Sequence, residues 1–173
     1  FEAAQAVLKH AKEDLGLQKI VSITNDDNQR SIKLLERLGL TFDKKIKLQG
    51  IEAPGLGQKC EVMVDNKSEY FPCGGMASTR LAKLIGRNNM LECTDEGQDD
   101  AGTQLAQCFV MSNNINLEMV KSGFATSSHD LFFAFWEVIA KIKKLGLWHS
   151  KFEDPVEWKK RWINEELKKQ ERE

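Results

Sequence analysis

The sequence lacks several features that would assign the chain to a broad functional class. No apolar run approaches the length of a membrane-spanning helix, and no signal peptide is visible. The four cysteines form no C-x-x-C pair, which argues against a zinc site. An excess of positive charge is also missing, because residues 51–150 carry nine Lys or Arg and twelve Asp or Glu. This segment therefore offers nucleic acid no overall electrostatic attraction.

The composition that is present is ordinary for a globular domain. The chain has 173 residues, of which 41% are hydrophobic and 29% are charged. This length fits one domain or two small ones, with ample material for a core. Because the chain opens at Phe1 rather than at methionine, the missing targeting signals do not decide its compartment.

Residues 45–60, KIKLQGIEAPGLGQKC, are the stretch around which the remaining segments are organised. Lys and Gln alternate here with Ile46, Leu48 and, after a glycine, Ile51, which is the period-two pattern of a strand buried on one face. Pro54 and the glycines that follow it end the strand. A strand that ends in an acidic residue and a tight turn presents a carboxylate at the rim of a barrel or sheet. Here that carboxylate is Glu52.

Periodicity and turn signals predict the elements on either side. Residues 1–48 are expected to form helix, strand, helix, strand, with the first strand at 19–24 and the second at 40–48. Downstream we expect a helix over 77–85, two strands within 90–111, a helix ending at Gly123 and a last helix that begins with Asp154 and Pro155. The loop between the two strands is acidic but fits no EF-hand spacing, so we favour solvated turns over calcium. Its carboxylates are Glu92, Asp95, Glu96, Asp99 and Asp100.

Aromatic and aliphatic residues crowd the segment 132–145. Exposed rings of this kind stack nucleic-acid bases. The helical spacing, with Trp148 behind it, favours instead a stripe that packs in the core. Its members are Phe132, Phe133, Phe135, Trp136, Ile139, Ile142 and Leu145.

From about 45 to 160 the chain resembles the thermonuclease (staphylococcal-nuclease-like) family, in the variety that carries extra cysteines. Six segments occur in family order: KLQGIEAPGLGQKC, FPCGGMASTRLAKLIG, DDAGTQLAQC, INLEMVKSGFA, FWEVIAKIKKLGLW and DPVEWKK. The resemblance implies an α+β fold, an OB-fold-like β-barrel with packing helices. It places a thermonuclease-like domain at residues 50–173.

That family typically cleaves phosphodiesters with a calcium ion held by two aspartates, a glutamate that activates water, and two arginines. Carried over residue by residue, the pattern has Glu52 at one aspartate and Gly55 at the glutamate, and Lys47 and Thr103 at the two arginines. No D-G-D-T motif occurs upstream to supply the second aspartate. Glycine takes no proton, and general-base catalysis is worth roughly 10²–10⁴-fold. Threonine has no charge, and lysine lacks the guanidinium fork. We therefore expect a degraded phosphodiesterase site. In the family's order (arginine, aspartate, glutamate, arginine) its positions hold Lys47, Glu52, Gly55 and Thr103, and Glu52 still offers calcium an oxygen ligand.

Residues 1–49 resemble instead the C-terminal half of a GNAT acetyltransferase, preceding the barrel. In such enzymes the asparagine of the motif N-x-x-S-x-x-L-L-x-x-L-G helps to hold acetyl-CoA, so Asn28 and Ser31 are the candidate acetyl-CoA residues. Leu35 stands where many members carry a tyrosine general acid, and the Gly-rich loop for the pyrophosphate should precede the first helix, inside which this chain starts. For the chain in isolation we favour a simpler role, in which Asn28 caps a helix and Ser31 lies in its first turn.

The two resemblances meet at 45–50 and leave the barrel open to three interpretations. A complete barrel needs two strands before KIKLQG. Either the barrel is incomplete, or the strands at 19–24 and 40–45 replace the missing ones, or the chain is a fusion whose parts form no single functional unit.

Cysteines recur at these four places in the cysteine-bearing relatives, so the resemblance implies that Cys60 bonds Cys73 and that Cys93 bonds Cys108. Each closure would stabilise the fold by roughly 3 kcal/mol on the chain-entropy estimate. Four reduced, buried thiols are the alternative, which a cytosolic acetyltransferase would favour. The first reading implies an extracytoplasmic protein and the second a cytoplasmic one.

Three functional hypotheses follow. The leading one is a nuclease-like OB-fold module with a degraded site, which binds a protein or nucleic acid or serves as a scaffold. The second is a partial acetyl-CoA-dependent N-acetyltransferase, and the third is a weak calcium-dependent endonuclease that uses Glu52 and Lys47. We expect no cofactor under the first hypothesis, acetyl-CoA under the second and calcium under the third, and no membrane partner under any.

Overall fold

The computed structural model describes residues 1–17, 20, 22, 24, 29–42, 45–86, 90–128 and 130–170. These residues fall into two compact units, Phe1–Lys45 and Ile46–Glu173.

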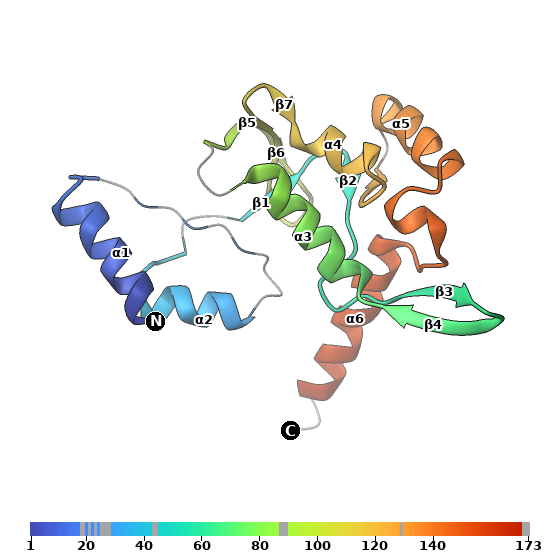
Figure 1. Ribbon diagram of the computed structural model, residues 1–173, viewed down its shortest axis with the longest axis horizontal. Helices are drawn as coiled ribbons and strands as arrows, with labels where there is room; N and C mark the ends of the chain where they lie inside the picture. The colour runs from blue at the N-terminus through green and yellow to red at the C-terminus, as the bar shows by residue number, and fades with distance from the viewer. Residues whose placement is uncertain are drawn as a thin grey trace. The chain divides into compact units, whose positions relative to one another are not determined.

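Two helices make up the first unit, α1 (Glu2–Glu13) and α2 (Gln29–Arg37), and neither contains a buried residue. Both are labelled in Figure 1. Gly16 and Gly39 follow them with φ of +63° and +81°, the left-handed conformation in which helices commonly end. The two predicted helices are thus confirmed. The candidate caps at 25–28 lie outside the described residues, as do three of the six residues of the strand predicted at 19–24.

The strands of the second unit form three small sheets. In the first, β1 (Ile46–Leu48) runs parallel to β6 (Gln104–Val110), while β5 (Glu92–Gln98) and β7 (Asn113–Asn114) pair antiparallel with β6. In the others, β2 (Ile51–Glu52) pairs with β8 (Thr126–Ser127), and β3 (Cys60–Val64) with β4 (Lys67–Phe71). The α+β class is confirmed. Within the described residues the strands do not close into a barrel, and none precedes β1.

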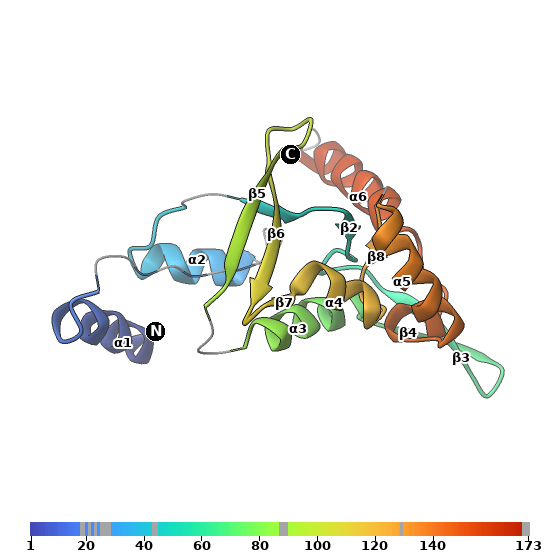
Figure 2. The same cartoon turned by 90° about the horizontal axis from the view of Figure 1, so that it is seen from above.

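The helices of the second unit are α3 (Cys73–Ile85), α4 (Ile115–Lys121), α5 (Leu131–Ile142) and α6 (Pro155–Gln170), with the 3-10 turn η1 (Gly146–His149) between the last two. Asp130 and Asp154 accept backbone N–H groups at the starts of α5 and α6. Figure 2 shows α3 and α4 beside the sheet that contains β6. Alternate residues of β6 are buried between these elements: Ala106, Cys108 and Val110, which cluster with Ile115 of α4 and pack against Leu81 and Leu84 of α3.

The strand predicted over 45–52 is in fact two strands, because Gly50 breaks it with φ +75°. β1 joins the sheet of β6, and β2 turns away to pair with β8. A Cβ at Gly50 would lie 2.7 Å from Cε2 of Phe133, so only glycine lets α5 pack this closely on the turn. Of the strand predicted at 40–48, only Ile46–Leu48 is strand, and residues 43 and 44 lie outside the described residues.

The aromatic segment is only partly core, which corrects the prediction made for it. Phe133 is 2% exposed and belongs to the core around Ile51 and Met119. Phe135 and Ile142 of the same helix are 61% and 76% exposed. Helix α5 therefore carries apolar side chains on opposite faces. Every helix within the described ranges is too short or too polar to span a bilayer.

Candidate functional site

Glu52 is a buried carboxylate at the end of β2. The whole residue is 6% exposed, and its neighbour Ile51 is part of the core. Its backbone is fixed by β8, in which Thr126 lies opposite and donates its hydroxyl to the Glu52 carbonyl at 3.2 Å. Glu52 lies at the end of a strand and before a tight turn, as predicted. Pro54 and Gly55 follow it in a turn that Gln58 closes with an N–H donated to the Gly55 carbonyl at 2.9 Å.

Two lysines hold the Glu52 carboxylate, one on each oxygen. Lys47 Nζ of β1 lies 2.5 Å from Oε1, and Lys159 Nζ of α6 lies 3.0 Å from Oε2. The carboxylate is 7% exposed, while the two lysine side chains are 40% and 42% exposed. The site is thus a buried anion between two half-exposed cations, with a net positive charge.

The pKa of Glu52 reflects a competition between burial and these cations. Desolvation on burial is the largest single influence and raises the pKa. The charges and hydrogen bonds of Lys159 and Lys47 together outweigh it, so the pKa lies below the ordinary carboxyl value. Glu52 therefore stays ionised at neutral pH, and its lone pairs are directed to ammonium groups.

Gly55, where the family resemblance implies a general base, lies in a turn that is closely covered by other residues. A Cβ at Gly55 would lie 2.4 Å from Cζ3 of Trp158, the indole of α6 that covers this turn. A Cβ at Gly74 of α3 would in turn meet the Gly55 carbonyl oxygen at 1.7 Å. Trp162 stacks on Trp158 with ring centroids 6.2 Å apart. No larger side chain fits at 55 unless the indole moves.

Thr103 lies in the turn between β5 and β6, and a backbone network defines this turn. The Asp99 carboxylate accepts the N–H groups of Ala101 and Thr103 at 3.0 and 2.8 Å, and Asp99 N–H donates to the Thr103 carbonyl at 3.0 Å. The hydrogen bond from Thr103 is the main reason that the pKa of Asp99 is lowered. Asp95 likewise accepts the N–H of Gly97 at 2.9 Å. Asp99 thus shapes the turn, whereas Glu92, Asp95 and Glu96, which were predicted to lie in this loop, belong to β5. The turn residue at 103 carries no charge.

Calcium does not fit the residues around Glu52. The ion requires six to eight oxygen ligands, several of them carboxylates. Both oxygens of the Glu52 carboxylate already bind lysine. Among the described residues there is no group of three or more His, Cys, Asp or Glu side chains that could hold a metal ion.

The candidate acetyl-CoA residues are only partly placed. Ser31 lies in the first turn of α2, as the helix-cap interpretation predicts. Asn28 lies outside the described residues.

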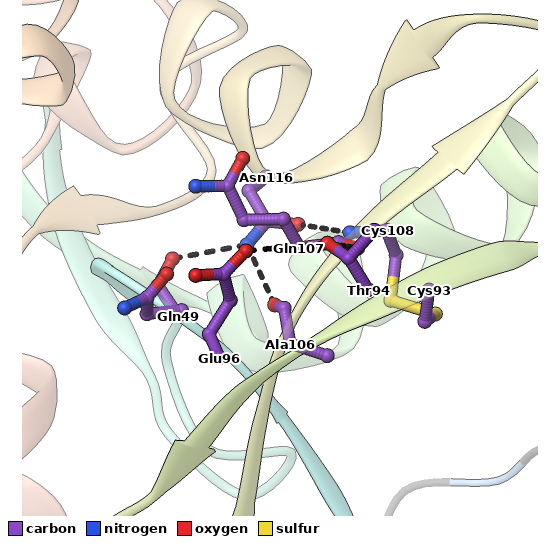
Figure 3. Close-up of a disulfide and its surroundings, with 8 residues drawn as sticks. All are labelled: Gln49, Cys93, Thr94, Glu96, Ala106, Gln107, Cys108 and Asn116. Atoms are coloured by element: carbon purple, nitrogen blue, oxygen red, sulfur yellow. Dashed lines mark hydrogen bonds between the residues drawn. A yellow bond between two sulfur atoms is a disulfide. The ribbon is translucent and has the colours of Figure 1, made fainter.

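The cysteines form the two pairs that the family resemblance implies. Cys60 and Cys73 join β3 to the start of α3 with Cα atoms 5.6 Å apart, and Cys93 and Cys108 face each other on β5 and β6 at 4.1 Å. Next to the second pair, Asn116 of α4 is fully buried (Figure 3). Its Oδ1 accepts the Cys108 N–H at 3.1 Å, and its Nδ2 donates to the carbonyls of Gln49 and Ala106 at 2.9 and 3.1 Å. Asn116 thus fixes the end of β1, which carries Lys47, to β6 and α4.

Sequence reasoning missed two residues of this site. Lys159 lies 107 residues from Glu52, and a charged position in an amphipathic helix gives no signal of its partner. Asn116 sits two residues after Asn114, which caps α4, and was indistinguishable by pattern from another residue of the first turn.

Comparison with known proteins gives two family matches and one curated relative. A family model described as "Staphylococcal nuclease homologue" matches residues 45–150, and one described as "Acetyltransferase (GNAT) domain" matches residues 1–41. An "Uncharacterized endonuclease" of Haemophilus influenzae (strain ATCC 51907 / DSM 11121 / KW20 / Rd) is 30% identical over 121 residues, which cover 67% of this chain. The chain spans 60% of the length of that relative.

Proposed function

The chain belongs to the staphylococcal nuclease homologue family, and within it we propose that residues 50–173 are a binding or scaffold module with a degraded phosphodiesterase site. One observation carries the proposal: both oxygens of the Glu52 carboxylate are bound by lysine ammonium groups, at 2.5 and 3.0 Å. The two positive charges take the place that a divalent cation needs. A metal-dependent hydrolase would have to displace both lysines from a buried anion.

The neighbouring positions support the same function. At 55 a glycine under Trp158 leaves no room for a proton acceptor. At 103 a threonine in a tight turn supplies no charge to a developing phosphorane anion. Each loss alone would slow phosphodiester cleavage by orders of magnitude, and together they remove activation of water and neutralisation of the transition state.

The charge balance favours a protein partner over a nucleic acid. Residues 51–150 hold more acidic than basic side chains, and affinity for nucleic acid depends mainly on lysines and arginines that neutralise phosphates. The paired cysteines support an extracytoplasmic location, because disulfides persist in oxidising compartments. We further propose that the short strands are an OB-type arrangement whose first two strands are incomplete.

Cleavage and binding assays on the full chain test this function. Labelled single-stranded DNA is incubated with the protein in Ca²⁺ or in EDTA, and Ca²⁺ binding is followed by calorimetry. We expect no calcium-dependent cleavage, no calcium heat and no salt-sensitive DNA binding. The matched control is Glu157→Ala, which changes an exposed ion pair of α6. If calcium stimulates cleavage, and the cleavage is lost in Glu52→Ala but kept in Glu157→Ala, the protein is instead a weak calcium-dependent endonuclease.

The match of residues 1–41 to the acetyltransferase family favours a second candidate, a partial N-acetyltransferase. The shared motif supports contact with acetyl-CoA through Asn28 and Ser31. Calorimetric titration of the full chain with acetyl-CoA tests it. Binding that is weakened by Asn28→Ala would support this candidate. The control Asn113→Ala, at an exposed strand residue of the second unit, should leave the binding unchanged.

A further inference from the structure

Helix α5 has an apolar stripe on its solvent side, which we call the outer stripe. Its members are Leu131, Phe135, Val138 and Ile142, which are 91%, 61%, 52% and 76% exposed. Their spacing of four, three and four residues brings them onto one line at 3.6 residues per turn. The buried residues Phe133 and Ala140 lie on the opposite side of the helix. Figures 1 and 2 show α5 at the edge of the second unit.

The charged side chains of α5 point away from the outer stripe. Lys141 Nζ lies 2.5 Å from the Glu137 carboxylate and 4.5 Å from the centre of the Trp148 ring. The other oxygen of Glu137 accepts the Ser127 N–H at 2.8 Å. Both charged groups are therefore directed toward the body of the protein. A surface helix ordinarily turns a polar face to water, and a helix that is apolar on all sides is normally covered.

We propose that the outer stripe binds the outer stripe of a second copy of this chain, with the two α5 helices antiparallel. The stripe is symmetric about a point between Phe135 and Val138. A two-fold axis there places Leu131 opposite Ile142 of the second copy, and Phe135 opposite Val138. Along the helix axis, the acidic start of one α5 at Asp130 is then level with the basic end of the other at Lys143. A parallel pair would instead place Asp130 on Asp130 and Lys143 on Lys143.

The exposed apolar area is sufficient for such a dimer. Phe132, one residue after Leu131, is 58% exposed beside the stripe. With it, these residues present at most roughly 600 Å² per chain, taking a large apolar residue as about 150–200 Å² when fully exposed. A dimer that covers all of this area buries roughly 1,200 Å², above the approximately 1,000 Å² that a specific interface needs.

Sedimentation equilibrium of the full chain between about 1 and 100 µM tests the association. We expect a reversible monomer–dimer equilibrium whose dissociation constant rises on the order of 30-fold or more in Phe135→Glu, because a charge then enters the centre of the interface. The control Tyr70→Glu changes an equally exposed aromatic residue on β4 and should leave the constant unchanged. Circular dichroism and thermal melting confirm that both variants fold.

A cross-linking experiment tests the orientation. Chains with Phe135→Cys are mixed with chains with Val138→Cys under mild oxidation. An antiparallel pair gives the mixed dimer in preference to either homodimer, whereas a parallel pair gives the two homodimers. The proposal is overturned if the chain stays monomeric over the whole concentration range, whether or not another part of the chain or another protein covers the outer stripe. It is also overturned if Phe135→Glu does not weaken the dimer, or if homodimers are preferred in the cross-linking.

Discussion

The ion pairs of Glu52 predict how much stability the protein loses when the charge of this carboxylate is removed. Glu52→Gln keeps the size of the side chain but removes its charge, so Lys47 and Lys159 lose their common partner. Breaking a fully buried ion pair costs about 3–5 kcal/mol. Because both lysines are about two-fifths exposed, water screens part of this loss, and we expect about 1–3 kcal/mol at pH 7. Urea unfolding followed by tryptophan fluorescence measures the difference at constant slope.

The same variant has a pH dependence with a definite sign. Since folding lowers the pKa of Glu52 below its ordinary value of 4.5, the ion pairs contribute fully above that value. Their contribution is lost as the pH falls through the lower pKa of the folded state. The stability gap between wild type and Glu52→Gln should therefore be constant near neutrality and shrink on acidification below about pH 4.5.

Glu157→Gln is the matched control, because its ion pair with Lys160 is exposed on the same helix that carries Lys159. It should change the free energy of unfolding by less than about 1 kcal/mol at pH 7. Equal stability of wild type and Glu52→Gln at pH 7, or a gap that persists undiminished in acid, would refute the account of Glu52 as a desolvated anion held by two cations.

Three further predictions concern the framework around the site. Asn116→Leu should lower the free energy of unfolding by about 2–5 kcal/mol, because the Cys108 N–H and the Gln49 carbonyl lose their buried partner. The control Asn113→Leu, at an exposed strand position, should have little effect on the midpoint of urea unfolding. Gly123→Ala should destabilise by at least about 2 kcal/mol more than Gly102→Ala, since both have positive φ but only a Cβ at 123 would meet a carbonyl oxygen, at 2.2 Å; comparable melting temperatures would contradict this. Reduction of both disulfides should lower stability by roughly 3 kcal/mol per closed loop, and an unchanged urea midpoint in dithiothreitol would show that the cross-links contribute nothing.

The sequence predicted those parts of the fold that depend on neighbouring residues. Local patterns predicted the helix end at Gly123, the capped start of α6 at Asp154 and a carboxylate at the end of a strand. The turn at Gly50 was harder, because the reason for that glycine is the ring of Phe133, 83 positions later. Alternation alone gave no sign that the chain changes sheets there.

The candidate site could be named from the sequence but its chemistry could not. The family pattern placed Lys47 and Glu52 and indicated that a base was missing at 55. It gave no sign that Lys159 would bind the second oxygen of Glu52 or that Trp158 would fill the space above Gly55. The periodicity of α5 showed that its residues lie on helix faces, yet it carried no information on which apolar face would remain in solvent.

The indole over Gly55 has a consequence for the history of this chain. An acidic residue at 55 would collide with Trp158 before it could serve as a base, so the single substitution lowers stability first and offers no activity in return. A smaller residue at 158 alone opens a void without restoring chemistry. Placing a base at 55 therefore requires two changes, neither of which selection would favour separately. Homologues that have kept an acidic residue at 55 should carry a small side chain where this chain has tryptophan.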